Sequence, residues 1–204
     1  MNHKSTVFVV DDDQDMRTSL RWLIESVGLY VETYSSAADF LSNYDTARPG
    51  CLVVDVRMPG MSGLELQEKF AAQNASIPII VITGHGDVAM AVRAMKTGAV
   101  DFIEKPFNDQ ILLDRIQQAI DKDAETRLIN AEYSTIAARI ASLTPREREV
   151  MEFIVAGRLN KQVAADLDIS IKTVEVHRAK IMEKMEAGTL PKLVEMVLRH
   201  KGKP

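Results

Sequence analysis

The chain has 204 residues, 46% of them hydrophobic and 26% charged, with one cysteine and a formal net charge of −4. This composition is ordinary for a globular protein with one large domain or two small ones, and the single cysteine, Cys51, excludes a disulfide within the chain. No apolar stretch approaches the length of a membrane span, so we expect a cytoplasmic protein with no membrane partner.

The charge is divided unevenly along the chain. Residues 1–122 carry 17 acidic and 11 basic side chains, a net charge of −6, and residues 123–142 carry a net charge of −1. Residues 143–204 carry 9 acidic and 12 basic side chains, a net charge of +3. A basic segment behind an acidic one is weak support for a nucleic-acid-binding domain at the C-terminal end.

In residues 1–122, short apolar runs alternate with amphipathic stretches. Apolar runs without polar alternation predict strands that are buried on both faces, as in a parallel sheet covered by helices. We therefore predict a doubly wound α/β domain with five parallel strands in the order 2-1-3-4-5. The predicted strands are VFVV at 7–10, LYVETY at 29–34, CLVV at 51–54, PIIVIT at 78–83 and VDFIE at 100–104.

Polar side chains of distinct chemistry mark the ends of four of these runs. They are Asp11 and Asp12 after the first run, Asp55 after the third, Thr83 at the end of the fourth and Lys105 after the fifth. Ligands bind at the carboxyl ends of the strands in open parallel sheets, so we expect these side chains to meet at one edge. Any one of these side chains could be merely a helix cap or a solvated residue. For the whole set, that explanation would have to apply separately at every one of these strand ends.

The chemistry of this set indicates phosphoryl transfer. Three neighbouring carboxylates repel one another and require a cation, and oxygen-only ligands suit Mg²⁺. Asp55 is then a candidate nucleophile, because a carboxylate can attack phosphorus to give an aspartyl phosphate. The ammonium of Lys105 would neutralise charge on the transferring group, and the hydroxyl of Thr83 would donate a hydrogen bond to it.

Four motifs carry a family resemblance: VDD at 10–12, VVDVRMPGMSG at 53–63, ITGHGD at 82–87 and DFIEKPF at 101–107. With them, residues 1–122 resemble the receiver domain of two-component response regulators. The resemblance implies that Asp55 is the phosphoacceptor. It also implies that Asp12 and Asp55 bind Mg²⁺ together with the backbone carbonyl of Arg57, whereas Asp11 acts mainly through bound water.

The same resemblance implies a switch. In such domains Thr83 and Lys105 contact the phosphoryl group, the hydroxyl moves inward, and the aromatic residue three positions before the lysine follows it. That residue is Phe102, which has no hydroxyl of its own, and simple core packing is the alternative explanation for it. The Lys105–Pro106 bond is expected to be cis, as it commonly is in this family.

Residues 123–142 are predicted to form a helical linker. An apolar seam with heptad spacing runs from Ile129 to Leu143, the residue that follows this segment. A connecting helix docked on one domain and a helix that pairs two copies both explain this seam, and the sequence does not decide between them. The seam consists of Ile129, Tyr133, Ile136, Ile140 and Leu143.

Residues 143–204 predict an all-α domain of four short helices. The segment TPRE at 144–147 combines a capping box with proline at the first helical position. The segment DIS at 168–170 makes a turn between a short helix with small residues and a longer polar helix. This is the rhythm of a helix-turn-helix motif.

Three segments of this domain carry a second resemblance: LTPREREV at 143–150, GRLNKQVAADLDIS at 157–170 and KTVEVHRAKIMEKM at 172–185. With them, residues 143–204 resemble the four-helix LuxR-type DNA-binding domain. Together with the TGHGD element they point to the FixJ-like branch of response regulators. The recognition helix is then expected at about 171–185.

The outer face of that helix is expected to contact DNA, while Val174, Ile181 and Met185 anchor the helix to its domain. A glutamate can accept from a cytosine amino group and a valine can touch a thymine methyl, so the expected base-edge readers are Glu175, Val176 and Ala179. Phosphate contacts that position the domain are expected from Lys161, Lys172, Thr173, Arg178 and Lys180.

These features predict a transcription regulator rather than an enzyme. A sensor histidine kinase would donate the phosphoryl group to Asp55 with Mg²⁺, and two receivers would then pair. The homodimer would bind double-stranded DNA and activate transcription through RNA polymerase. Its only chemistry would be to take up and slowly lose its own phosphoryl group.

Other classes of protein stay open. A Mg²⁺-dependent phosphohydrolase needs a second acid beside its aspartyl nucleophile, but Val56 and Arg57 follow Asp55. A phosphorylation-independent DNA-binding protein with a degenerate receiver would not need the complete set of acidic, hydroxyl and lysine side chains. An RNA-binding tail is disfavoured, because this tail lacks the aromatic residues on which bases stack.

Overall fold

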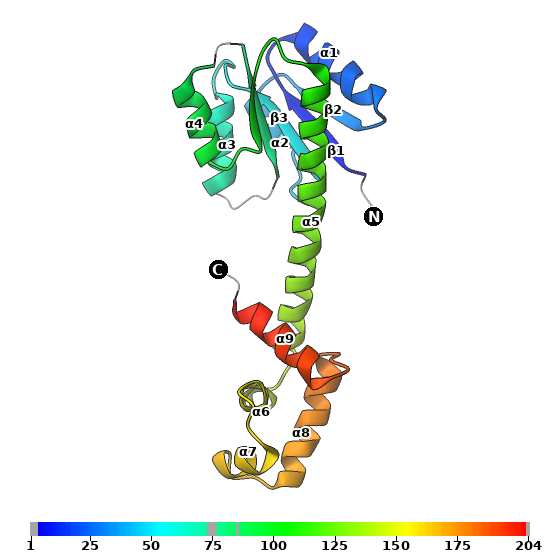
Figure 1. Cartoon of the computed structure of the whole chain (residues 1–204), viewed down its shortest axis with the longest axis vertical. Coiled ribbons are helices and arrows are strands. Elements are labelled where there is room, and N and C mark those ends of the chain that lie inside the picture. Colours follow the sequence, from blue (N-terminus) through cyan, green and yellow to red (C-terminus); the bar gives the residue numbers. More distant parts are fainter. Residues whose placement is uncertain (1–3, 73–76, 85, 203–204) are drawn as a thin grey trace. The chain divides into compact units, whose positions relative to one another are not determined.

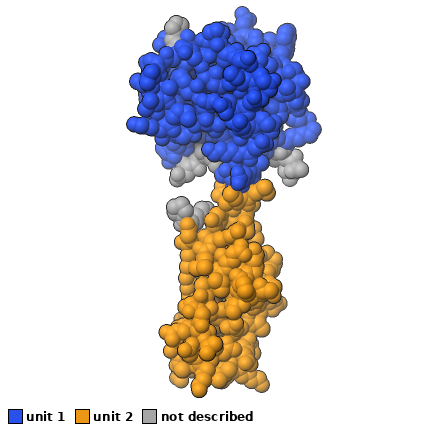
Figure 2. Space-filling view, viewed as in Figure 1, with its two compact units in different colours: residues 1–127 blue, residues 128–204 orange. Residues whose placement is uncertain are grey.

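The computed structural model describes residues 4–72, 77–84 and 86–202. The chain forms two compact units, Met1–Arg127 and Leu128–Pro204, which Figure 2 colours blue and orange. The first unit is an α/β domain and the second is helical (Figure 1). None of the helices among the described residues combines the length and apolar character that a membrane crossing needs.

The first unit contains a sheet of five parallel strands in the order β2-β1-β3-β4-β5, so the predicted fold and strand order are confirmed. The strands are β1 (Thr6–Val10), β2 (Tyr30–Tyr34), β3 (Gly50–Asp55), β4 (Ile79–Thr83) and β5 (Asp101–Glu104). The helices are α1 (Gln14–Ser26), α2 (Ala37–Asn43), α3 (Gly63–Ala72), α4 (Val88–Lys96) and α5 (Asp109–Ala141).

Helices cover both faces of this sheet. On one face, Val9 and Val53 belong to a core that α1 and α5 complete. On the other face, Val10 and Val54 belong to a core that α2, α3 and α4 complete. Every residue of β1, β3 and β4 is buried, which explains why their sequences show no polar alternation.

Helix α5 is one continuous helix of 33 residues. It runs through residues 123–141, most of the segment that the sequence suggested as a linker, because no glycine or proline interrupts it. The boundary between the two units falls after Arg127. Within the first unit, Oδ2 of Asp123 accepts from the Gly50 N–H at 2.9 Å and from Nε of Arg127 at 2.7 Å. The bond from Gly50 fixes this part of α5 to the start of β3, and Arg127 supplies the charge partner of Asp123 within the helix.

The second unit combines the end of α5 with the four predicted helices, whose existence is confirmed. They are α6 (Pro145–Val155), α7 (Asn160–Asp166), α8 (Ile171–Lys184) and α9 (Leu190–Lys201). Ile136 and Leu143 of the apolar seam are buried in the core of this unit, and Ile140 packs against it. The C-terminal part of the seam therefore packs against the helices of this unit. Ile129, at the N-terminal end of the seam, stays 46% exposed.

Helix α6 begins with the predicted capping box. The side chain of Thr144 accepts from the Glu147 N–H, and Oε2 of Glu147 accepts from the Thr144 N–H at 2.9 Å. The same oxygen accepts from Nζ of Lys184 on α8 at 2.6 Å. The bond from Lys184, followed by that from the Thr144 N–H, lowers the pKa of Glu147 to about 2. This link between α6 and α8 is therefore present at neutral pH and is lost only as the pH falls towards that value.

Candidate functional site

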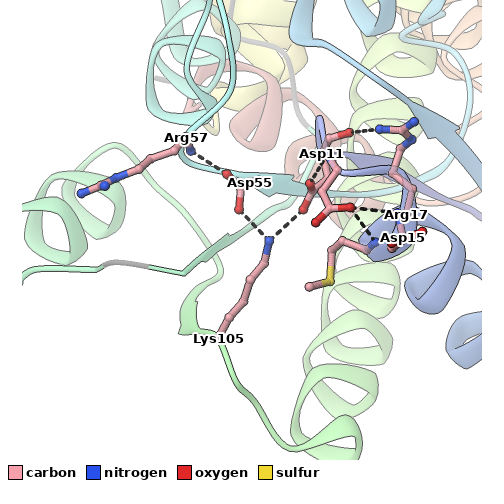
Figure 3. Close-up of polar contacts among 8 residues, drawn as sticks. Asp11, Asp15, Arg17, Asp55, Arg57 and Lys105 are labelled. Atoms are coloured by element: carbon pink, nitrogen blue, oxygen red, sulfur yellow. Dashed lines mark hydrogen bonds and ion pairs between the residues drawn. The ribbon is translucent and has the colours of Figure 1, made fainter.

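Four strand ends bring the predicted side chains of the first unit to one edge of the sheet. Asp11 directly follows β1, Asp55 ends β3, Thr83 ends β4 and Lys105 directly follows β5. The strands are parallel, so their carboxyl ends lie at the same edge. Figure 3 shows Lys105 reaching from its loop to Asp11 and Asp55.

The side chain of Lys105 joins two buried carboxylates. Its Nζ atom lies 2.8 Å from Oδ2 of Asp11 and 2.7 Å from Oδ1 of Asp55. The Asp11 side chain is 1% exposed and the Asp55 side chain is 8% exposed. Two carboxylates with so little hydration depend on a positive charge between them.

Backbone N–H groups hold the other carboxylate oxygens. The Asp13 N–H donates to Oδ1 of Asp11 at 2.9 Å, and the Arg57 N–H donates to Oδ2 of Asp55 at 2.6 Å. Arg17 on α1 donates from its guanidinium to the backbone carbonyl of Asp11 at 2.6 Å (Figure 3). Sequence reasoning missed Arg17, since an arginine on an amphipathic helix is usually solvated.

Burial and pairing act in opposite directions on this cluster. Burial raises the pKa of the Asp11 carboxyl, and the hydrogen bonds from Lys105 and from the Asp13 N–H only partly offset that effect. Burial alone would lower the pKa of the Lys105 ammonium, but its hydrogen bonds to Asp11 and Asp55 hold that pKa above its ordinary value. Lys105 is therefore a positive charge at neutral pH.

The donors at this edge suit a hard divalent cation, because Asp11 and Asp55 offer only oxygen atoms. Asp12, the third predicted carboxylate, is exposed, and Asp13 caps the start of α1 with its side chain. Within residues 4–72, 77–84 and 86–202, no three acidic, histidine or cysteine side chains converge on a point that could hold a metal ion. Lys105 instead occupies one oxygen of each buried carboxylate.

The predicted switch residues lie beside this cluster. Thr83 is fully buried, and its backbone carbonyl accepts from the Lys105 N–H at 2.7 Å. Phe102 on β5 is partly buried and packs against the core shared with α2, α3 and α4. The Lys105–Pro106 bond is cis, as predicted.

In the second unit, α8 corresponds to the predicted recognition helix, and its predicted anchors Val174, Ile181 and Met185 are buried. The hydroxyl of Thr173 lies 2.8 Å from the hydroxyl of the N-cap residue Ser170, so Thr173 also takes part in the start of the helix. Of the residues predicted to contact DNA, Arg178 is half-buried. The exposed ones are Lys161, Lys172, Thr173, Glu175, Val176, Ala179 and Lys180.

Comparisons with known families match both parts of the chain. Residues 7–117 match the response regulator receiver domain, and residues 141–197 match the bacterial regulatory proteins of the luxR family. The chain is 47% identical over 199 residues to the transcriptional regulatory protein FixJ of Bradyrhizobium diazoefficiens, covering 98% of this chain and 97% of that protein. It is 48% identical over 193 residues to FixJ of Rhizobium meliloti, covering 95% of each.

Solved structures give the same result. The response regulator StyR matches with a TM-score of 0.90 at 47% identity, covering 96% of this chain and 99% of that one. Full-length FixJ from B. japonicum matches with a TM-score of 0.58 at 45% identity, covering 100% of both chains.

An α/β unit with paired aspartates and a lysine at its strand ends, followed by a helix-turn-helix unit, defines a receiver with a DNA-binding output. The chain belongs to the response regulators that combine a receiver domain with a LuxR-type DNA-binding domain, and it is similar to FixJ. Such proteins are phosphorylation-dependent regulators of transcription, which act with a sensor kinase and with DNA. Their receiver domains typically bind Mg²⁺ through acidic residues, and they are generally not enzymes.

Proposed function

We propose that Asp55 is the phosphoacceptor of this response regulator. The observation that supports it is the position of Nζ of Lys105, within hydrogen-bond distance of both Asp11 and Asp55. An oxygen of the Asp55 carboxylate attacks the phosphorus of a phosphohistidine on the sensor kinase. The phosphorus–nitrogen bond breaks, and the histidine leaves with the electron pair. Attack by water on the aspartyl phosphate later releases inorganic phosphate and restores the carboxylate.

The neighbouring side chains would bind and orient the transferred group. Lys105 would pair with a phosphoryl oxygen in place of the Asp55 carboxylate. The positive charge of the lysine then stays close to the reacting atoms. We assign to Thr83 the hydroxyl that donates to the phosphoryl group, and to Phe102 the ring that follows Thr83 and changes the exposed face of the receiver.

The proposed Mg²⁺ ligands are Asp12, Asp55 and the backbone carbonyl of Arg57, and Asp11 would act on the cation mainly through bound water. A bound cation would neutralise the carboxylates and the charge of the transferring phosphoryl group. The oxygen-only donors of the two buried aspartates support this assignment. So does the exposure of Asp12, because an exposed side chain can turn towards a ligand without repacking the core.

Phosphorylation would then pair two receivers, and the homodimer would bind a two-fold symmetric site on double-stranded DNA. Exposed apolar residues on α4 and α5 support such pairing, among them Val92, Met95 and Ile111. We further propose that the dimer activates transcription through RNA polymerase in the cytoplasm. In this assignment residues 1–122 are the receiver, residues 123–142 the helical linker and residues 143–204 the DNA-binding domain.

The phosphoacceptor is tested by intact mass and light scattering after incubation with acetyl phosphate. We expect one added phosphoryl group and a larger particle for the wild type with Mg²⁺, and neither in EDTA or for Asp55→Asn. Asp121→Asn, which removes an exposed carboxylate of α5, should behave as the wild type. Modification without a change in size would contradict the dimer. An unmodified wild type would contradict the phosphoacceptor and favour the degenerate receiver.

The DNA contacts are tested by selecting binding sites from random-sequence DNA. Glu175→Ala should change the selected bases, because a lost base-edge contact alters discrimination by about 1–3 kcal/mol. Lys172→Ala should leave the selected bases unchanged, weaken binding to all sequences alike and reduce the salt slope by about 1. Equal losses on selected and random DNA for Glu175→Ala would refute the base-reading role of Glu175.

A further inference from the structure

The loop between β4 and α4 contains two glycines in very different surroundings. A Cβ at Gly86 would lie 3.0 Å from Cε1 of Phe102 and 3.0 Å from Cγ2 of Thr83. Carbon atoms prefer to be about 3.5–4.0 Å apart, so a methyl group does not fit there without movement. A Cβ at Gly84 would meet nothing within 4 Å. Of these two glycines, Gly86 is therefore the one at which a side chain would be crowded.

The two ends of this loop are held in place. Thr83 ends β4, and its carbonyl accepts from the Lys105 N–H at 2.7 Å. Asp87 caps α4, because its Oδ1 accepts from the Met90 N–H at 2.7 Å. The ring of Phe102 is only partly buried. If a methyl group is added at position 86, the ring is the group that can yield most easily.

We propose that Gly86 is a positioning residue of the phosphorylation response, because its missing side chain leaves the space in which the Phe102 ring lies beside the Thr83 methyl group. This inference rests on the proposed function of Asp55, Thr83 and Phe102. The atoms nearest to an added Cβ belong to Phe102 and to the Thr83 methyl group, not to Asp55 or Lys105, so Gly86→Ala should still take up the phosphoryl group. The added methyl group should displace the ring from its place beside Thr83, so that the ring no longer responds when Asp55 is phosphorylated.

The test is fluorine NMR on the full chain labelled with fluorophenylalanine, which gives six labelled rings. The Phe102 resonance is the one that is absent from Phe102→Leu. In the wild type and in Gly84→Ala, it should shift when acetyl phosphate and Mg²⁺ add the phosphoryl group, as checked by mass in the same sample. In Gly86→Ala, the resonance should be displaced from the start and should not shift further, although the same mass is added.

The inference is overturned if the Phe102 resonance of Gly86→Ala starts and shifts as in the wild type. It is also overturned if the wild-type resonance does not shift although Asp55 is phosphorylated. If the wild type takes up no phosphoryl group, the proposed function fails instead, and the unphosphorylated spectra still show whether position 86 sets the place of the ring.

A second measurement covers poor folding of Gly86→Ala. The loss of Tm on going from glycine to alanine should be smaller in a Phe102→Leu background, since the shorter side chain relieves the crowding. An equal loss in both backgrounds would overturn the steric link between the two positions.

Discussion

Replacing Lys105 with methionine is expected to destabilise the fold by about 3 kcal/mol at neutral pH in EDTA. Methionine keeps most of the length of the side chain but removes the ammonium that lies between Oδ2 of Asp11 and Oδ1 of Asp55. The Asp11 side chain is only 1% exposed, so its charge would be neither paired nor well hydrated. Equilibrium unfolding in urea measures the loss directly.

The size of this loss should depend on pH. The hydrogen bond and the charge of Lys105 lower the pKa of Asp11 against the larger effect of burial, so the substitution raises that pKa further. A carboxyl whose folded pKa lies above its unfolded value contributes stability at low pH, and this contribution disappears as the pH rises through the folded value. Lys105→Met should therefore be less destabilising at acidic pH than at neutral pH.

The matched control is Lys122→Met, which removes an exposed ammonium on α5. Its effect should stay within about 0.5 kcal/mol at every pH. Equal losses for the two lysines, or a loss for Lys105→Met that grows as the pH falls, would contradict a buried ion pair at the carboxyl ends of β1 and β3.

The α/β layout and the gathering of the acidic cluster could be predicted because both follow from strand burial. Strands that are buried on both faces appear in the sequence as uninterrupted apolar runs, and the residue that ends each run lies at the carboxyl edge of the sheet. Asp55 and Lys105 are 50 residues apart in the chain, yet their positions at strand ends are enough to predict that they lie close together. The identity of the Mg²⁺ ligands does not follow in the same way. It depends on side-chain orientation, and it stays a prediction.

Contacts between a side chain and distant backbone were not predictable. Arg17 and Arg127 look like solvated arginines on helices, and only the register of each helix against the sheet shows which carbonyls they reach. Arg127 donates to backbone carbonyls 79 to 81 residues away in the chain. The space needed at Gly86 is hidden for a similar reason, since it is set by a ring on the neighbouring strand β5.

In the helical unit, too, local features could be predicted from the sequence and contacts between distant segments could not. The start of α6 and the buried side of α8 follow from caps and helical spacing, which are local properties of the sequence. The participation of Ile136 in the core of this unit depends on where α5 ends, and a seam of about two heptads does not decide whether it docks or pairs. The continuous α5 is thus the element that the sequence described least well.

Arg127→Met is expected to destabilise the first unit by about 3 kcal/mol. The guanidinium is the charge partner of Asp123, whose side chain is 1% exposed, and it also donates to three loop carbonyls. These carbonyls are those of Thr46 and Ala47, each at 3.1 Å, and that of Arg48, at 2.7 Å. Methionine fills part of the volume but leaves a buried carboxylate without its charge partner, although it still accepts from the Gly50 N–H. The effect is measured as the loss in the free energy of unfolding of the first unit in urea.

Two further variants separate the buried charge from other causes. Asp123→Asn in the Arg127→Met background should recover part of the stability, because an amide oxygen can still accept from the Gly50 N–H while the unpaired charge is gone. Arg115→Met removes a more exposed pair on the same helix, with side chains 42% and 29% exposed, and should cost less than about 1 kcal/mol. If Asp123→Asn deepens the loss instead, the buried charge is not its cause, and the lost bonds to the loop carbonyls account for it.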